Sequence, residues 1–335
     1  MAVTINDVAK SAGVSIATVS RVVNGRGSVN ELLKNKVMQA IKELGYVPNS
    51  NAQALKQDCS KMIGFTASDL SGSFFPEVVK RVEKEVFSAG YATIISSTYD
   101  SAKNERNVLE HMISRRVDAL LVNSTGQNED LLKQIVEAGT PVILYDRRSL
   151  SHDFPTVYMD KQGAVYQAMD HLYGLGHRRI ALVTGPESLT SNHDRYMGLQ
   201  NFVTDRELDP TAAASYFGVF SEEYGYSIME EFMQMPQRPT AVITGSISIT
   251  SGIMRYCREH GISVPDDLSL VSSGDFIYGS AIGFKLTYMD DRVEELSDGV
   301  LRLLQQALQK DVILPNEQIV LPPQLCVGMS TGARK

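Results

Sequence analysis

Hydrophobic residues recur three to four positions apart throughout the first 48 residues. This periodicity predicts three short helices, over residues 5–13, from 16 to about 24, and from about 30 to 44. Gly13 lies in the tight turn between the first two helices, and Gly45 follows the third. Two short helices joined by such a turn and covered by a third indicate a helix-turn-helix domain, although a small helical bundle without a ligand has the same periodicity.

From Met62 onward, short apolar strands alternate with amphipathic helices. Strands are expected at residues 62–66, 91–97, 119–122, 141–145, 156–159, 180–184, 241–244, 268–271 and 319–321. Helices are expected to include residues 75–89, 106–114, 130–138, 163–175, 196–203, 224–233, 252–260 and 292–309. Apolar strands alternating with helices predict parallel sheets covered on both faces. The elements are too many for one doubly wound unit, so we expect two, with the chain crossing near 150–160 and again near 285–292.

The uneven charge of the chain favours a DNA-binding interpretation of the helical head. Over all 335 residues the formal net charge is −7, which on its own argues against contact with nucleic acid. Residues 1–60, however, hold seven basic and four acidic residues, a net charge of +3 that leaves −10 on the remainder. A basic head on an acidic body is expected where one small domain touches phosphate.

The start of the second helix carries the candidate base contacts, because in a helix-turn-helix domain these residues reach the major groove. They are Ser15, Ile16, Ala17, Thr18, Ser20 and Arg21. Arg21 can pair with guanine or with phosphate. Ile16 and Ala17 offer only apolar contact, for instance to a thymine methyl group.

Nothing in the composition indicates a membrane or an oxidising compartment. No stretch approaches the roughly 18 apolar residues of a transmembrane helix, and the N-terminus lacks the apolar segment of a signal peptide. The three cysteines, Cys59, Cys257 and Cys326, lie far apart and are a poor disulfide framework. We therefore expect a cytoplasmic protein, associated with the nucleoid when bound to DNA and without membrane contact.

Two other classes of protein are disfavoured. An enzyme is the main rival, yet the chain has no GxSxG, P-loop or GxGxxG motif, and its six histidines form no HExxH or HxH pair. A transport-type binding protein would carry a signal peptide and no basic helical head. We expect no catalysis, no cofactor and no metal.

Several runs of residues carry a family resemblance. They are 4–10 (Thr-Ile-Asn-Asp-Val-Ala-Lys), 12–15 (Ala-Gly-Val-Ser), 18–24 (Thr-Val-Ser-Arg-Val-Val-Asn) and 43–49 (Glu-Leu-Gly-Tyr-Val-Pro-Asn). They resemble the opening of the lactose/galactose-repressor family of bacterial transcription regulators. Residues 176–180 and 264–269 are also family-like, so the resemblance covers essentially the whole chain.

The resemblance implies a domain plan and a second DNA-contacting element. The plan is a helix-turn-helix domain over 1–48, a hinge over 49–60, and an effector-binding and dimerisation body over 61–335, related to the periplasmic sugar-binding fold. In this family the hinge folds into a helix on operator DNA, and Leu55 aligns with a leucine wedge that opens the minor groove. The candidate DNA contacts added by the resemblance are Thr4, Asn24, Asn49, Ala52, Gln53 and Leu55. The family's usual arginine is Gln53 here, which alters one hinge contact, and a plain polar linker is the alternative for the segment.

The effector is expected between the two α/β units, because ligands of open parallel sheets bind beyond the carboxyl ends of the strands. Arg195 matches the family's ligand-binding arginine, and its planar fork suits a diol, a carboxylate or a phosphate. Phe220 falls at an aromatic position where a ring can stack on a sugar or base, although Phe74 and Phe220 can also be core residues. The full candidate set is Asp69, Phe74, Ser124, Asp146, His193, Arg195, Phe220, Ser246 and Asp275.

Two departures from the family change the second half of this cleft. The usual Asn-Asp after strand 241–244 is Ser246-Ile247, and the first aspartate of the pair after strand 268–271 aligns with Gly274, while Asp275 remains. A pocket built for sugar hydroxyls is expected to lose selectivity without these polar groups.

Three accounts of the effector stay open. The first is a less hydroxyl-rich or anionic effector held by Arg195 with help from Arg147, Arg148 or His193, although Arg147 and Arg148 also fit an exposed pair. The second is a conventional sugar bound mostly by the first half of the cleft. The third is a degenerate cleft, with regulation through a partner protein or expression level.

The combined expectation is a homodimeric transcriptional regulator, most simply a repressor. It binds double-stranded operator DNA and is controlled by a small molecule, sugar-like or anionic, in the cleft of its body. Both an inducer and a co-repressor are allowed. The tail from Gly328 to Lys335 carries no leucine heptads, so no added tetramerisation helix is expected.

Overall fold

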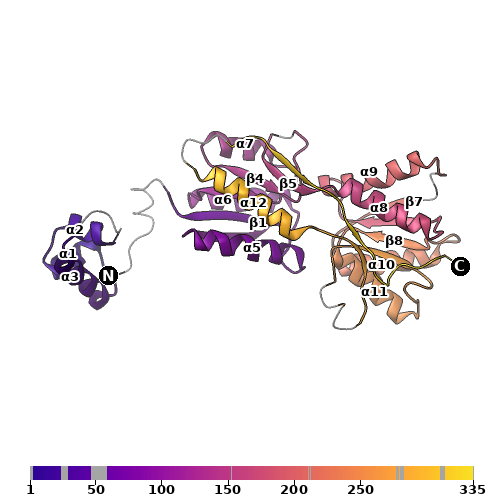
Figure 1. The fold of residues 1–335 in the computed structure, drawn as a ribbon, viewed down its shortest axis with the longest axis horizontal. Coiled ribbons are helices and arrows are strands. Elements are labelled where there is room, and N and C mark those ends of the chain that lie inside the picture. Colours follow the sequence, from indigo (N-terminus) through magenta and orange to yellow (C-terminus); the bar gives the residue numbers. More distant parts are fainter. Residues whose placement is uncertain are drawn as a thin grey trace. The chain divides into compact units, whose positions relative to one another are not determined.

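The chain forms two compact units, Met1–Ser60 and Lys61–Lys335 (Figure 1). The structure is a computed structural model, and it describes residues 3–23, 29–46, 59–151, 153–209, 211, 213–276, 279, 283–309 and 314–334. No helix within these described residues is long and apolar enough to cross a membrane.

The N-terminal unit contains the three expected helices. They are α1 (Ile5–Ala12), α2 (Ile16–Val23) and α3 (Glu31–Leu44). Their core is small and apolar, with the side chains of Val8, Val19 and Val37 fully buried between them. The sequence predicted these helices well because their inward stripes follow the 3.6-residue helical period.

Local hydrogen bonds and glycines set the ends of these helices. At the start of α1, the carboxylate of Asp7 accepts hydrogen bonds from the backbone N–H of Thr4 at 2.8 Å and from its hydroxyl at 2.7 Å. Gly13 and Gly45 end α1 and α3 with left-handed φ values of 64° and 61°, which glycine adopts without steric cost.

The C-terminal unit contains two six-stranded sheets, each the centre of one sub-domain. The first sub-domain holds β1 (Met62–Ala67), β2 (Ala92–Ser97), β3 (Ala119–Val122), β4 (Val142–Tyr145), β5 (Thr156–Met159) and β11 (Gln318–Leu321), in the order β11-β5-β4-β3-β1-β2. The second holds β6 (Ile180–Thr184), β7 (Ala213–Phe217), β8 (Ala241–Thr244), β9 (Ser269–Ser273), β10 (Thr287–Met289) and β12 (Leu325–Cys326), in the order β12-β10-β9-β8-β6-β7. Neighbouring strands are parallel, except that β12 runs antiparallel to β10.

Helices cover both faces of each sheet, as the apolar strands predicted (Figure 1). In the first sub-domain, one face packs on α5 (Phe74–Ser88) and α12 (Val293–Ala307), and the other on α6 (Ala102–Ser114) and α7 (Glu129–Glu137). In the second, one face packs on α8 (Lys161–Gly174) and α9 (Thr190–Asp205), and the other on α10 (Glu222–Gln234) and α11 (Ile247–Glu259). The fold is therefore an α/β body with a separate helical head.

The chain crosses between the two sheets three times. It passes from β5 to α8 at Asp160, returns from β10 to α12 through residues 290–292, and passes from β11 to β12 through residues 322–324. The sequence pattern indicated the first two crossings, and the structure adds the third. It was missed because β10 and β12 are only three and two residues long, too short to show an alternating pattern. The first two crossings bring charged residues to the space between the sheets.

Two glycines allow α10 and α11 to pack closely. A Cβ atom on Gly225 would overlap the backbone carbonyl of Ile249, and one on Gly252 would overlap the backbone carbonyl of Glu222. Each glycine therefore faces the backbone of the other helix, and neither obstacle is a side chain that can turn away.

We expect Gly252→Ala to lower the free energy of unfolding by about 1–3 kcal/mol, because the added methyl forces the two helix backbones apart. Gly174→Ala is the matched control, since a Cβ there meets nothing within 4 Å and alanine favours a helix. Urea unfolding followed by circular dichroism measures both. Equal midpoints for the two variants would contradict the close packing.

Candidate functional site

The N-terminal end of α2 lies at the surface of the head. Ser15, Ile16, Ala17 and Arg21 are exposed, with Ile16 at 51% of its full exposure, while Thr18 and Ser20 are half-buried. The backbone N–H of Thr18 donates to the Ser15 hydroxyl at 3.2 Å, and the two hydroxyls are 2.9 Å apart. Ser15 therefore caps the helix that carries the other candidate contacts.

The remaining candidate DNA contacts divide into two groups. Thr4 is exposed at the start of α1, where it bonds Asp7. The others lie outside the described residues, as does the hinge segment through residue 58; they are Asn24, Asn49, Ala52, Gln53 and Leu55.

A cavity of about 460 Å³ lies between the two sub-domains of the body. Such a volume is typical of a site for a small molecule. Six of the sequence-predicted effector residues line it, and they are Asp69, Phe74, Asp146, Arg195, Phe220 and Ser246. Five of them follow strands or lie at the starts of helices, as expected for the carboxyl ends of parallel strands, and Arg195 lies in the second turn of α9.

The other three predicted residues lie outside the lining of this cavity. Ser124 is buried in the loop after β3, where its hydroxyl accepts a hydrogen bond from the backbone N–H of Gly126 at 3.0 Å. His193 is exposed on α9, because two positions along a helix from Arg195 place it on another face. Asp275 is exposed beyond the end of β9.

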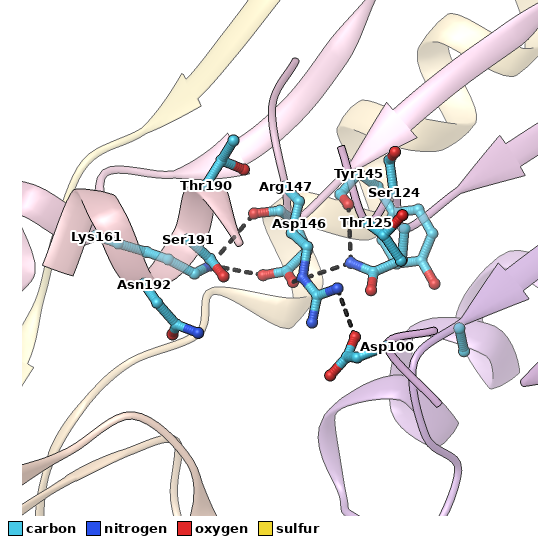
Figure 2. Close-up of polar contacts among 12 residues, drawn as sticks. Asp100, Ser124, Thr125, Tyr145, Asp146, Arg147, Lys161, Thr190, Ser191 and Asn192 are labelled. Atoms are coloured by element: carbon cyan, nitrogen blue, oxygen red, sulfur yellow. Dashed lines mark hydrogen bonds and ion pairs between the residues drawn. The ribbon is translucent and has the colours of Figure 1, made fainter. Parts of the chain in front are cut away.

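An ion-pair network occupies the part of the cavity beside β4 (Figure 2). The Lys161 ammonium lies 2.6 Å from Asp146 Oδ1, and Asn123 Nδ2 donates to Asp146 Oδ2 at 3.1 Å. Next to it, Arg147 Nη1 lies 2.6 Å from Asp100 Oδ1 and Arg147 Nε lies 4.0 Å from Asp146 Oδ2. Burial alone would raise the pKa of Asp146, but Lys161 and Arg147 outweigh burial and hold it below its usual range.

Arg147 and Arg148 are not an exposed pair. The side chain of Arg147 is only 3% exposed and lines the cavity. Arg148 points elsewhere and forms two hydrogen bonds to the carboxylate of Asp194 on α9, at 2.6 and 3.1 Å. This second pair joins the two sub-domains, since Arg148 follows β4 and Asp194 belongs to α9.

Arg195 brings a buried positive charge to the cavity without a carboxylate partner. Its guanidinium donates to Ser191 O at 3.3 Å, Asn192 Oδ1 at 3.0 Å and Ser273 Oγ at 3.2 Å. Among the described residues, no carboxylate lies within 4.0 Å of it. Burial lowers the pKa of Arg195, although Asp146 and Asp291 oppose that effect, and arginine stays charged.

Several lining residues were missed by sequence reasoning. They are Ser68, Asp100, Lys161, Ser191, Ser273 and Asp291, among others. Asp291 corrects one expectation, because it places a carboxylate in the second half of the cleft, where the residue types at 246 and 274 had indicated a loss. Only the pairing of β10 with β9 brings Asp291 there, and β10 has no strand signal in the sequence. The described residues contain no group of three or more His, Cys, Asp or Glu side chains placed to hold a metal ion.

Two family models match parts of the chain. Residues 4–49 match the model described as "Bacterial regulatory proteins, lacI family", which covers the helical head. Residues 169–331 match the "Periplasmic binding protein-like domain", which covers most of the second sub-domain and the return crossing.

Curated relatives and solved structures extend over most or all of the chain. The catabolite control protein A of Priestia megaterium is 27% identical over 332 residues, covering 99% of this chain and 100% of its own. The HTH-type transcriptional repressor PurR of Escherichia coli O139:H28 is 34% identical over 271 residues, covering 80% of this chain and 79% of its own. The Lac repressor dimer bound to operator and the anti-inducer ONPF superposes with a TM-score of 0.84 at 26% identity, over 99% of this chain and 100% of that one.

We expect Lys161→Met to lower the free energy of unfolding by about 3 kcal/mol or more at pH 7, because it leaves the Asp146 carboxylate buried with less compensation. Adding Asp146→Asn to that variant is expected to restore much of the loss. Lys133→Met is the control, since Lys133 pairs with Asp153 at the surface, where a pair contributes at most about 1 kcal/mol. The prediction fails in urea unfolding if the single variant and the control have the same midpoint.

Proposed function

The chain belongs to the lacI family of bacterial regulatory proteins, and from this premise we propose a repressor whose operator binding is controlled by a small molecule in the cavity between its sub-domains. The family makes the chain a DNA-binding transcriptional regulator and not an enzyme. The effector, the contact residues and the dimeric arrangement are parts of the proposal.

The head supports operator binding through the exposed end of α2. Ile16, Ala17 and Arg21 present apolar and cationic groups side by side, a combination suited to thymine methyl groups and to guanine or phosphate. The excess of three positive charges in residues 1–60 is small, so one head alone binds weakly. We propose that a homodimer places two heads on the half-sites of one operator, which multiplies the affinity. A Lac repressor dimer bound to operator is among the similar structures, in agreement with this arrangement.

The observation that carries the effector proposal is the buried guanidinium of Arg195. A buried charge without an oppositely charged partner costs folding free energy. Arg195 lines a cavity of the right size, and Phe220 is also among the lining residues. We propose that a sugar or sugar derivative supplies a further acceptor for the guanidinium, as a hydroxyl, carboxylate or phosphate. One similar structure, CelR, is a complex with cellobiose.

The cavity is also placed where a ligand can change the relation between the two sub-domains of the body. Two ion pairs, Asp146–Lys161 and Arg148–Asp194, join the sub-domains around it, and the chain crosses there. An effector that contacts both sub-domains binds one arrangement of them more tightly than another. This difference in binding free energy is the coupling on which control of DNA binding depends. Both an inducer and a co-repressor fit this scheme.

We expect Arg21→Ala to weaken binding to the operator by about 1–3 kcal/mol, with a smaller effect on random duplex. The operator is first selected from a pool of random duplexes, and binding is measured by fluorescence anisotropy at several salt concentrations. Lys34→Ala on α3 is the control, because Lys34 is an exposed cation paired with Glu31. Equal losses on operator and random DNA would remove Arg21 from the base-contacting set.

The proposed role of Leu55 in the hinge is tested separately. Leu55→Ala is expected to reduce operator affinity much more than affinity for random duplex, because a minor-groove wedge acts only on DNA that it can bend. The same anisotropy titrations measure it, with Val47 and Pro48 left unchanged. A uniform loss on both duplexes would favour a plain linker at residues 49–60.

Arg195→Met is expected to abolish the thermal stabilisation that an effector produces, because the anchoring donor is lost. A thermal-shift screen uses D-glucose, D-glucosamine, D-gluconate, D-glucose 6-phosphate and cellobiose; a ligand at about 100 times its Kd stabilises by about 2.7 kcal/mol. Arg206→Met is the control, since Arg206 lies just beyond the end of α9 and pairs with Asp170 at the surface. An unchanged shift in the Arg195 variant would exclude Arg195 from the site.

A further inference from the structure

The carboxyl group of Asp291 reaches the cavity from the return crossing of the chain. Asp291 lies two residues beyond β10, and the backbone around it is held from both sides. Gly274 N donates to Met289 O at 2.9 Å, and Asp290 N donates to Gln324 O at 2.9 Å. The position of Asp291 is therefore fixed by the second sheet and by the third crossing, not by a mobile loop.

Gly274 provides the space for this carboxyl group. It ends β9 with φ of 82°, and a Cβ atom there would lie 2.5 Å from Asp291 Oδ2. Any other residue at 274 would thus push the carboxyl group out of its place. The aspartate that the family pattern leads one to expect at 274 and the one at 291 cannot both occupy this part of the cavity.

Asp291 and Arg195 are left without charged partners in the same cavity. Within the described residues, Asp291 forms no hydrogen bond or ion pair, although it is only partly exposed. The neighbouring charges are those of Lys161 on α8, Asp146 after β4, Arg195 on α9 and the adjacent Asp290. Burial raises the pKa of Asp291 to about 6, and the cations reduce this effect without forming a contact.

Within the described residues the Asp291 carboxylate has no hydrogen-bond partner, and the Arg195 guanidinium, although it donates to Ser191, Asn192 and Ser273, has no carboxylate that balances its charge. Asp146 and Arg147 in the same cavity do have ionic partners, at 2.6 Å to Lys161 and to Asp100 respectively. The charges of Asp146 and Arg147 are thus balanced within the network that links the sub-domains, whereas those of Asp291 and Arg195 are available to a ligand.

We propose that Asp291 is a specificity-determining residue of the effector site, where its carboxylate accepts a hydrogen bond from a hydroxyl or ammonium group of the effector while Arg195 donates to an acceptor on the same molecule. This inference rests on the proposed function, because it concerns the same cavity. It also makes the site selective: an effector with a carboxylate or phosphate must direct that group to Arg195 and a donor group to Asp291.

One test needs no ligand. A carboxyl group whose pKa is raised on folding destabilises the folded state as it ionises, so wild-type stability is lost as the pH rises from about 4 through 6. Asp291→Asn keeps the shape and removes this penalty. We expect the variant to have the higher melting temperature at pH 8 and the difference to vanish near pH 4. A lower melting temperature than wild type at pH 8 would mean that Asp291 supports the fold, and would overturn the proposal.

The second test measures ligand affinity with four probes that share one skeleton: D-glucose, D-glucosamine, D-gluconate and D-glucose 6-phosphate. Each probe that stabilises the wild-type chain is titrated against Asp291→Asn, Gly274→Ala and the control Asp298→Asn, an exposed carboxylate on α12. We expect Kd to rise about tenfold or more in the first two variants and to stay unchanged in the third.

An ammonium group and a hydroxyl group of the effector, as donors to Asp291, are distinguished by how affinity responds to pH and to Asp291→Asn. For an ammonium donor, the wild-type affinity falls as the pH drops below about 6 and Asp291→Asn abolishes that dependence. For a hydroxyl donor, Asp291→Asn retains part of the affinity, because the amide oxygen still accepts. A probe that stabilises wild type and Asp291→Asn equally overturns this inference alone, whereas probes that stabilise neither count against the proposed function itself.

Discussion

The ion pair between Lys161 and Asp146 is the interaction on which the arrangement of the body depends. Asp146 ends β4 of the first sub-domain, and Lys161 is the first residue of α8, directly after the chain has crossed to the second. Each charge is buried and is compensated mainly by the other, so separating the sub-domains there would expose or strand both. The pair therefore links the two sub-domains beside the cavity, which both residues line (Figure 2).

The same interaction divides the charges of the cavity into two sets. Asp146 pairs with Lys161 and Arg147 pairs with Asp100, so each of these charges has an ionic partner, although the buried Nε of Arg147 has no hydrogen-bond acceptor. Arg195 and Asp291 also line the cavity, and among the described residues neither has an oppositely charged partner within 4.0 Å. Which lining residues are available to a ligand therefore depends on the ion pairs that they already form with one another.

The sequence was informative wherever a property is local. The head was predicted almost to the residue, because Gly13 and Gly45 end helices whose inward stripes show a clear period. Strands such as β3 and β6 were found because they are short, continuous apolar runs. By contrast, β7 at the edge of its sheet was missed, since Ala-Ala-Ser-Tyr-Phe is only half-buried and lacks a strand pattern. Candidate residues at the carboxyl ends of predicted strands, such as Asp146, reached the cavity, whereas Ser124 turned into its own loop.

Asp291 shows why some of the cavity residues could not be predicted from the sequence. Its place depends on a three-residue strand, on two backbone hydrogen bonds to distant segments and on the missing side chain of Gly274, and none of these is visible as a pattern. Considered alone, Gly274 indicated the loss of a ligand-binding carboxylate. In three dimensions the absence of a Cβ atom is what admits a carboxylate from the neighbouring strand, so the substitution moves the acceptor within the cavity. Because Asp291 lies on a crossing segment and not at a strand end, the proposed ligand would contact a connection between the two sub-domains directly.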